Sequence, residues 1–328
     1  MDDALPTADD VADAYLRLRE WVVETPVLES AALNERLGLR VLFKAECLQH
    51  TGSFKIRGAL NRLLQLKADE REAGVVAFSS GNHAQAVALA AHWLGMRAAI
   101  VMPSDAPAVK VESTRAWGAE VVLYDRVRED REAIAHRLAA ERGAVLVPPF
   151  DHAHIIAGQG TAALELARFA RERRLTIEAL YVPCSGGGLV AGSALAVKSE
   201  FPGCAVYAVE PQGFDDTAQS LAAGKRCRAA SSGTTLCDGL MVAMPGAITF
   251  AVNRRELAGA LTVDDAQVRA AMAFAAQRLK VVLEPSGAAA LAAVLATPPR
   301  DRRCIAVMLS GGNVDTELFS DVIRATGS

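Results

Sequence analysis

GVVAFSSGNHAQAVALAAHWLGMRAAIVM, residues 74–102, is the stretch of sequence that decides the fold. Short apolar runs at residues 74–78 and 98–102 are typical of buried strands, and residues 84–94 between them have helical periodicity. A strand, a crossover helix and a second strand form a βαβ unit, in which the two strands run parallel. The stretch therefore predicts a parallel sheet covered by helices.

The same alternation of strand-like and helix-like segments continues along the chain. It covers residues 109–117, 120–124, 128–142, 144–147, 156–173, 179–183, a helix after Gly188, 205–209, 264–279 and 304–309. Strands that alternate with helices in this way are typical of sheets with helices on both faces. We predict the α/β class, with two three-layer α/β/α domains whose sheets are mostly parallel.

The composition is that of a folded protein and excludes several classes of function. Of the 328 residues, 51% are hydrophobic, and 35 Lys and Arg against 38 Asp and Glu give a net charge of −3. Because this balance gives no basic surface for phosphates, nucleic acid is not expected as a partner. The sequence has no apolar stretch of membrane-spanning length and no signal-peptide pattern, so we expect no membrane partner and a cytoplasmic location. The six scattered cysteines are expected to be mostly reduced thiols.

The first motif is TGSFKIRGA, residues 51–59, a glycine-containing loop that brings Lys55 to the start of a helix. Burial and the positive end of the helix dipole both disfavour an ammonium group, so the Lys55 amine loses its proton more easily. A lysine that forms a Schiff base requires this property. The alternative is a solvated lysine at a turn, and this motif alone leaves both interpretations open.

The second motif is SSGNHAQ, residues 79–85, which lies between a predicted strand and a predicted helix. Small hydroxyl and glycine residues at a helix N-terminus leave backbone N–H groups free to bind a carboxylate or a phosphate. An ordinary helix cap would explain Ser80 or Asn82 singly, but it explains the whole run less easily.

Two glycine-rich loops also follow predicted strands, namely CSGGGL at residues 184–189 and SGGN at residues 310–313. Three consecutive glycines let the backbone close around a phosphate at a helix N-terminus, although glycine-rich turns are common. The spacing fits neither the dinucleotide fingerprint nor the P-loop. Because ligands bind at the carboxyl ends of strands in open α/β sheets, we expect all four motifs to converge on one site.

In this order, the four motifs resemble those of the fold-type II pyridoxal phosphate enzymes, specifically the family of threonine and serine dehydratases and serine racemase. The likeness runs from Thr25 to Ile323. It implies a tryptophan synthase β-like fold and pyridoxal phosphate as the cofactor. It also implies a large cofactor-binding domain of residues 1–73 and 151–328, and a small domain of residues 74–150 that closes over the substrate.

The resemblance assigns roles around the cofactor to individual residues. Lys55 would hold the cofactor as a Schiff base and then remove the substrate α-proton, while Phe54 would pack against the pyridine ring. Asn82 would bond the phenolic oxygen of the cofactor. Ser310 would face the ring nitrogen, where a neutral hydroxyl favours β-elimination over transamination. The phosphate would be held by Ser185, Gly186, Gly187, Gly188 and Leu189.

The resemblance also implies a loop that receives the substrate carboxylate, formed by Ser79, Ser80, Asn82, His83 and Gln85. Ser80 matches the second-face acid/base of serine racemase, so it is a catalytic candidate beside Lys55, unless it only supports the loop. Arg131 matches an arginine that contacts the second polar end of a ligand in serine racemase, although a solvated helix arginine is the alternative. Val242 replaces a serine used for the same purpose, which leaves hydroxyaspartate specificity open.

A divalent cation is a further expectation. Glu210 and Asp216 match carboxylates that, with the backbone carbonyl at the position of Phe214, bind a divalent cation in serine racemase. Hard oxygen ligands suit Mg²⁺ or Ca²⁺. The alternative is that the two acids cap the next helix.

The resemblance thus implies an ammonia-lyase that removes the β-hydroxyl and the amine of L-threonine or L-serine, giving 2-oxobutyrate or pyruvate and ammonia. The alternatives on the same scaffold are 3-hydroxyaspartate ammonia-lyase and serine racemase. The alternative from another class is a non-catalytic protein that binds an amino acid or the cofactor. A small hydroxy amino acid is the expected partner, and the family favours a homodimer.

Overall fold

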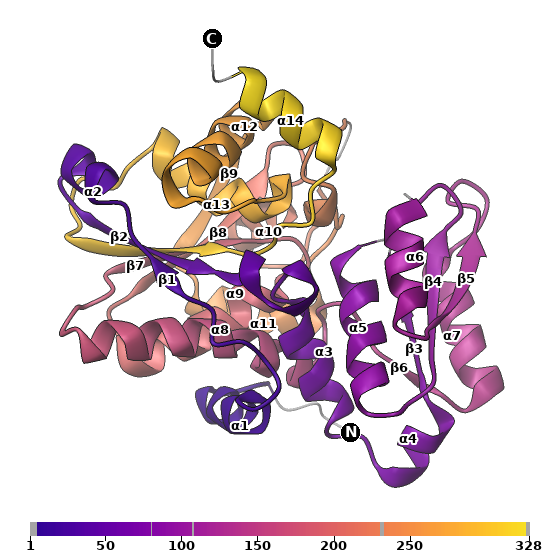
Figure 1. Cartoon of the computed structure of the whole chain (residues 1–328). Helices are drawn as coiled ribbons and strands as arrows, with labels where there is room; N and C mark the ends of the chain where they lie inside the picture. Colours follow the sequence, from indigo (N-terminus) through magenta and orange to yellow (C-terminus); the bar gives the residue numbers. More distant parts are fainter. Residues whose placement is uncertain (1–4, 80, 107, 230–232, 326–328) are drawn as a thin grey trace.

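The computed structural model describes residues 5–79, 81–106, 108–229 and 233–325, and it contains two sheets, each flanked by helices. Figure 1 shows the larger, six-stranded sheet on the left and the smaller, four-stranded sheet on the right. The predicted α/β class with two mostly parallel sheets is therefore confirmed. Within the described residues, no helix is both long enough and apolar enough to cross a membrane.

The six-stranded sheet is parallel except at one edge, where β1 pairs antiparallel with β2. Its strands, in spatial order, are β1 (Val27–Leu28), β2 (Arg40–Ala45), β10 (Cys304–Leu309), β7 (Ala179–Pro183), β8 (Ala205–Pro211) and β9 (Gly259–Val263). The last strand in sequence, β10, lies between β2 and β7, with Ile305 in register with both Val41 and Ala179. The carboxyl ends of β2, β10 and β7 therefore lie at the same edge of the sheet.

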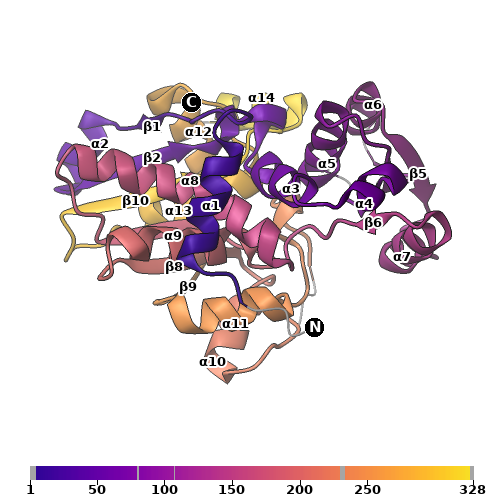
Figure 2. The same ribbon diagram turned by 90° about the horizontal axis from the view of Figure 1, so that it is seen from below.

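Helices cover both faces of this sheet (Figures 1 and 2). One face packs against α1 (Ala8–Leu18), α8 (Ala153–Glu172) and α9 (Gly188–Glu200), and the other against α12 (Asp265–Phe274), α13 (Pro285–Ala296) and α14 (Thr316–Ala325). Side chains alternate between the two faces of a strand. Accordingly, Val307 of β10 packs with the second group of helices, whereas Met308 packs with the first. The remaining elements of this body are α2 (Ala31–Leu37), α10 (Asp216–Ala223), α11 (Ala247–Glu256), a π-helix (Ala275–Leu279) and the 3-10 turns η1 (Glu46–Leu48), η2 (His50–Gly52) and η3 (Asp238–Leu240).

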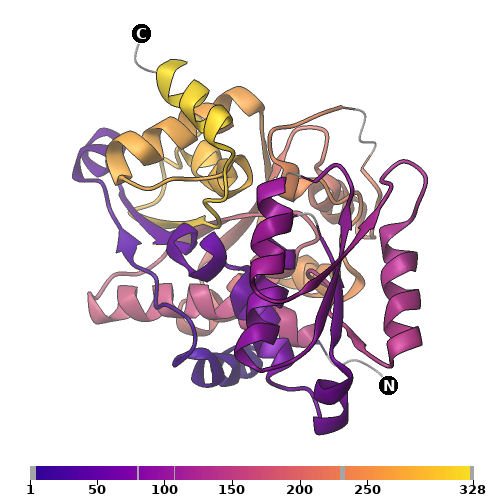
Figure 3. The same ribbon diagram turned by 45° about the vertical axis from the view of Figure 1, so that its right-hand side comes forward.

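The four-stranded sheet is entirely parallel, with helices on both faces. Its strands, in spatial order, are β5 (Glu120–Tyr124), β4 (Ala98–Pro103), β3 (Val75–Phe78) and β6 (Val145–Leu146), and its helices are α4 (Ala68–Ala73), α5 (Asn82–Trp93), α6 (Ala108–Ala116) and α7 (Arg131–Arg142). Figure 3 shows α5 and α7 on opposite sides of the sheet. Ala77 of β3 packs towards α5, whereas its neighbour Val76 packs towards α7.

Helix α3 (Lys55–Leu63) connects the two bodies, because it packs against α8 of the larger one and α5 of the smaller one. Ile56 and Leu60 belong to the same buried cluster as Val87 of α5 and Ile155 of α8. Every strand of the four-stranded sheet lies inside the predicted small domain, residues 74–150. The domain limits themselves stay a prediction.

Candidate active site

Lys55 is the first residue of α3, at the end of a loop that is bonded to the segment after β10. The N–H of Phe54 donates to the carbonyl oxygen of Ser310 at 3.1 Å, and Ser53 forms a β-bridge with Gly311. Lys55 Nζ donates to the carbonyl oxygen of Pro149 at 2.9 Å and lies 5.1 Å from the centre of the Phe54 ring. The predicted positions of Phe54, Lys55 and Ser310 therefore lie together.

The Lys55 amine is easier to deprotonate than an ordinary lysine. Burial lowers its pKa to about 8, and the negative charge of Glu284 opposes that shift. A free amine near neutral pH is the form that attacks a carbonyl carbon and accepts a proton. The local surroundings of Lys55 therefore suit the chemistry expected from the sequence.

Residues 147–150, which follow β6, contact three other parts of the chain. Lys55 Nζ reaches Pro149, and His83 Nε2 lies 3.0 Å from the carbonyl oxygen of Val147. A Cβ atom at Gly186 would collide with the ring of Phe150, so the glycine-rich loop rests on this same segment. The segment thus brings Lys55, His83 and the start of α9 to one place.

His83 is an uncharged imidazole. Burial, followed by the positive charge of Lys55, lowers its pKa to about 3. A carbonyl oxygen can only accept, so the contact with Val147 assigns the ring hydrogen to Nε2. The buried Nδ1 then carries a lone pair and has no hydrogen-bond partner in the described structure.

Asn82 is bonded through both ends of its amide. Nδ2 donates to Glu284 Oε1 at 2.6 Å, and Oδ1 accepts from Asn313 Nδ2 at 2.7 Å. Asn313 Nδ2 also donates to the carbonyl oxygen of Thr51 at 2.7 Å. Asn82 begins α5 beside the four-stranded sheet, whereas its partners belong to the other body, so these bonds join the two bodies at the site.

Glu284 immediately precedes α13 and is buried beside these groups. Its pKa is raised to about 7, because the effects of burial and of the Asp238 charge outweigh the bond from Asn82 and the charges of Lys110 and Lys55. The carboxyl group therefore changes charge near neutral pH. Glu284 Oε1 also lies next to Gly311, so a Cβ atom added at Gly311 would collide with this oxygen.

The glycine-rich loop follows β7 and opens α9. Gly187 has a φ of 95°, which favours glycine, and a Cβ atom there would lie 2.6 Å from Asn253 Nδ2. The loop is fixed from outside by Thr249 Oγ1, which donates to the carbonyl oxygen of Gly186 at 2.6 Å. Ser185 Oγ accepts from the N–H of Val242 at 3.1 Å. With the free N–H groups of the first turn of α9, the run from Ser185 to Leu189 has the chemistry of a phosphate cradle.

Of the other residues predicted to contact substrate, Ser79 and Gln85 lie at the start of α5. Ser79 Oγ accepts from the N–H of Gly81 at 3.1 Å, and Gln85 lies in the first turn of α5. Ser80 lies outside the described residues. Arg131, the first residue of α7, is exposed, and its guanidinium carbon lies 5.6 Å from the centre of the Phe78 ring. Phe78 belongs to the buried cluster on the α7 side of the sheet, so the contact places Arg131 beside the end of β3.

Glu210 and Asp216 lie at the end of β8 and the start of α10, where Thr217 contacts Cys184 at the start of the glycine-rich loop. Glu210 accepts from the N–H groups of Thr217 and Ala218, both at 2.9 Å, so it caps α10 as one alternative anticipated. Both carboxylate oxygens of Asp216 are buried and have no hydrogen-bond partner among the residues that the structure describes. Among the described residues, no group of three His, Cys, Asp or Glu side chains could hold a metal ion.

Three functional candidates were absent from the sequence interpretation. Pro149 contributes only a backbone carbonyl, which no side-chain pattern can reveal. Asn313 belongs to the SGGN loop, whose pattern assigns it no role, and its contact with Asn82 spans 231 residues. Glu284 carried one signal, because an acid directly before Pro285, at a helix start, is placed to meet polar groups at the sheet edge.

Comparison with known proteins agrees with this geometry. The family model "Pyridoxal-phosphate dependent enzyme" matches residues 18–311. The chain is 45% identical to L-threo-3-hydroxyaspartate ammonia-lyase of Saccharomyces cerevisiae over 320 residues, which cover 97% of each chain.

Two solved structures share the fold along nearly the whole chain. A threonine deaminase from the organism abbreviated T.th. has a TM-score of 0.89 and 44% identity, covering 94% of this chain and 99% of that one. Maize serine racemase has a TM-score of 0.90 and 40% identity, covering 98% of each chain. The chain therefore belongs to the fold-type II pyridoxal-phosphate dependent enzymes, in the family of threonine and serine dehydratases and serine racemase.

Proposed function

We propose that this protein is an ammonia-lyase that converts L-threonine to 2-oxobutyrate and L-serine to pyruvate, with release of ammonia. The observation that carries the proposal is the half-buried Lys55 amine, which has a pKa of about 8 and lies at the start of a helix. Bound pyridoxal phosphate supplies an electron sink for the charge that develops at the substrate α-carbon. The residues of the chain then have to bind the substrate, orient it and move protons.

The residues at the site fit the cofactor. The run Ser185–Leu189 would hold its phosphate with backbone N–H groups of α9. Asn82 has two N–H donors and gives one to Glu284, so the second is available for the phenolic oxygen. Ser310 would offer a neutral hydroxyl to the ring nitrogen, which favours elimination of the β-hydroxyl.

Lys55 would move the proton of the substrate α-carbon. Its amine accepts a proton at Nζ, and a base with a pKa near the working pH is the most effective. The N-terminus of α5, with Ser79, Asn82, His83 and Gln85, would bind the substrate carboxylate and orient this bond. We propose that the small domain, residues 74–150, carries this loop over the substrate and excludes water.

A second candidate is 3-hydroxyaspartate ammonia-lyase. The identity of 45% to the yeast enzyme favours it, and so does the position of Arg131 beside Phe78, because a second carboxylate needs a cation. The backbone of Val242, where serine racemase has a serine, contacts Ser185. Turnover of this dicarboxylic substrate with loss of activity in Arg131→Met would favour it over L-threonine.

A divalent cation at Glu210 and Asp216 belongs to the same proposal. Burial raises the pKa of Glu210 to about 7 and that of Asp216 to about 8, and the charge of Glu210 adds to the shift at Asp216. With the carbonyl oxygen of Phe214 they offer hard oxygen ligands for Mg²⁺ or Ca²⁺. We also propose a cytoplasmic homodimer, and light scattering of the purified protein would test the dimer.

The deciding experiment is an absorbance spectrum of the purified protein, followed by assays with L-threonine, L-serine and the 3-hydroxyaspartate diastereomers. We expect a visible cofactor band that Lys55→Ala abolishes, and 2-oxobutyrate with ammonia from L-threonine. D-serine as the main product from L-serine would instead assign the chain to the racemases and make Ser80 the next target. Absence of both band and product after addition of pyridoxal phosphate would overturn the proposal.

A further inference from the structure

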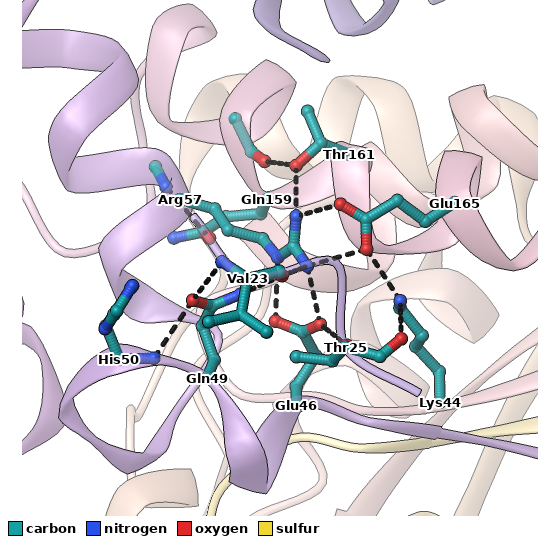
Figure 4. A network of polar contacts seen from close by, with 12 residues as sticks. Val23, Thr25, Lys44, Glu46, Gln49, His50, Arg57, Gln159, Thr161 and Glu165 are labelled. Carbon is teal, nitrogen blue, oxygen red and sulfur yellow. Dashed lines mark hydrogen bonds and ion pairs between the residues drawn. The ribbon is translucent and has the colours of Figure 1, made fainter. Parts of the chain in front are cut away.

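A closed network of buried charges lies beneath the helix that carries Lys55 (Figure 4). Its four charged members are Lys44 in β2, Glu46 in η1, Arg57 in α3 and Glu165 in α8, each no more than 3% exposed. Two positive and two negative charges make the network neutral as a whole. It joins three elements of the large body to the helix that begins at Lys55.

Arg57 is the centre of this network, because carboxylates bind its guanidinium on two edges. Nε and Nη2 donate to Glu46 at 2.7 and 2.8 Å, and Nη1 and Nη2 donate to Glu165 at 2.6 and 2.8 Å. Nη1 also donates to Thr161 Oγ1 at 3.1 Å, and Nη2 to the carbonyl oxygen of Val23 at 3.2 Å. Two bidentate contacts on one planar group fix its orientation as well as its position.

The carboxylates that hold Arg57 are themselves held. Lys44 Nζ donates to Glu165 Oε2 and to the carbonyl oxygen of Thr25, both at 2.6 Å. Thr25 Oγ1 donates to Glu46 Oε1 at 2.5 Å. Neither acid can therefore follow a displaced guanidinium without breaking a second buried bond.

A second contact fixes α3 one residue further along. A Cβ atom at Gly58 would lie 2.9 Å from the carbonyl oxygen of Ile155, and one at Gly158 would lie 2.6 Å from the carbonyl oxygen of Arg57. The backbones of α3 and α8 thus touch at a pair of glycines. With the guanidinium on one side, this contact leaves α3 little freedom to rotate about its own axis.

The network is a costly way to gain stability alone. Apolar side chains of similar volume are often as stabilising as a buried ion network, because charges lose hydration on burial. The charged network instead fixes the orientation of the Arg57 guanidinium, because a bidentate contact tolerates little change of angle. Lys55 lies two residues before Arg57, on the turn whose orientation the network fixes.

We propose that Arg57 is a positioning residue for Lys55. The bidentate contacts of Glu46 and Glu165 with its guanidinium fix the rotation of α3 about its axis, and this rotation sets the direction in which the Lys55 amine points. The inference rests on the proposed role of Lys55 as the cofactor lysine. Arg57 would touch neither substrate nor cofactor itself. A displacement of about 1 Å at a reacting group costs up to about 100-fold in rate, so small rotations of α3 matter.

The test replaces Arg57 with Lys, which keeps the charge and removes the planar fork. The cofactor is first removed from the full chain by dialysis against L-cysteine. Competitive acetylation, followed by mass spectrometry, then gives the pKa of Lys55. The exposed Lys67 and Lys225 serve as internal references. We expect the pKa to rise from about 8 towards 10.5, because a rotated Lys55 gains water. At pH 8 a rise of about one unit lowers its labelling about fivefold. In the reloaded enzyme we expect kcat to fall about tenfold or more with KM little changed.

Arg142→Lys is the matched control, because Arg142 also makes a bidentate pair, with Glu120, but at the surface of the four-stranded sheet. It should leave both the Lys55 pKa and kcat unchanged. Glu46→Gln is the second variant if Arg57→Lys does not fold, and it should move the Lys55 pKa in the same direction by less. The labelling needs no substrate, so it reports the pKa of Lys55 even if the proposed reaction is wrong. A folded Arg57→Lys or Glu46→Gln chain with the wild-type Lys55 pKa would overturn the proposal, whatever its melting temperature.

Discussion

Asn82 and Glu284 form a hydrogen bond of 2.6 Å between Nδ2 and Oε1, although 202 residues separate them in the chain. The contact links the start of α5, beside the small sheet, to the turn before α13 in the large body. Both this bond and the charge of Lys55 lower the pKa of the buried Glu284 carboxyl group. The contact between the two bodies at this point and the charge of Glu284 are therefore coupled.

Replacement of Asn82 by Asp should lower kcat/KM for L-threonine by about 10- to 100-fold. The new carboxylate would face Glu284, and like charges at hydrogen-bond distance repel strongly in a buried site. The double variant Asn82→Asp with Glu284→Gln should recover part of the loss, since the repulsion is gone. Steady-state kinetics of the two single variants and the double variant decide the matter. Equal losses in Asn82→Asp and in the double variant would show that Glu284 is not involved.

Glu284 should make the cofactor-free protein less stable as the pH rises. Its folded pKa of about 7 lies above the ordinary value of 4.5, so its stabilising contribution is complete below pH 4.5 and is lost as the pH rises through 7. Glu284→Gln is therefore expected to raise the free energy of unfolding at pH 8 by about 2–3 kcal/mol relative to wild type, and to change it little at pH 4.5. Urea unfolding at the two pH values measures the difference. The same offset at both would contradict the assignment.

His83 should have the opposite sign of pH dependence. Its folded pKa of about 3 lies below the ordinary 6.5, so the unfolded chain binds a proton first as the pH falls, and stability is lost between pH 6.5 and pH 3. At pH 5 this costs about 2 kcal/mol. His83→Gln, which can still donate to Val147, should unfold at a urea concentration that changes less between pH 7 and pH 5. Nitrogen NMR of the wild-type ring should show a neutral imidazole protonated at Nε2 throughout that range.

Gly187→Ala should weaken cofactor binding about tenfold or more. The left-handed backbone and the 2.6 Å approach to Asn253 leave no room for a methyl group, so the cradle must shift. Gly224→Ala is the control, because Gly224 is also left-handed, with a φ of 67°, but a Cβ atom added there would have no described residue within 4 Å beyond its chain neighbours. Fluorescence titration of the cofactor-free variants with pyridoxal phosphate compares the two. Equal weakening in both would mean that backbone strain, and not the cradle, is responsible.

A divalent cation should raise the melting temperature through Asp216. EDTA is expected to lower the melting temperature of the purified protein by a few degrees, and Mg²⁺ or Ca²⁺ to restore it, since a ligand bound only to the folded state stabilises it. Asp216→Asn should remove this response, whereas Asp215→Asn, at the neighbouring position, should keep it. An Asp216→Asn variant that still responds to the cation would exclude the proposed ligand set.

The strands that the sequence predicted best are those bounded by clear turns. Residues 120–124, 179–183 and 304–309 are strands with the predicted limits, because each is a short apolar run between polar loops. The helix predicted from residue 128 begins at Arg131 instead, since Asp130 Oδ1 accepts from the N–H groups of Glu132 and Ala133 and caps it there. A local capping contact of this kind competes with periodicity and is decided by backbone geometry.

Strand β2 was not predicted, and Lys44 explains why. A lysine near the end of an apolar run normally indicates exposure, yet Lys44 is buried because Glu165, 121 residues later, neutralises it. The motifs around Lys55, Asn82 and Ser310 could be recognised because each is a local run of unusual residues. Glu284 and Arg57 act through partners that are distant in the chain, so only the folded structure brings their roles to light.

The position of β10 has a consequence for biosynthesis. A ribosome makes β2, β7, β8 and β9 before it makes the strand that sits between β2 and β7 in the finished sheet. Until that strand arrives, two inner strand edges lack their partner and are open to pairing with other chains. Nascent or truncated chains that stop before residue 304 should therefore be prone to aggregation and should bind holding chaperones. Ser310 directly follows this strand and accepts from the N–H of Phe54, so the loop before Lys55 gains this partner only after β10 has been made.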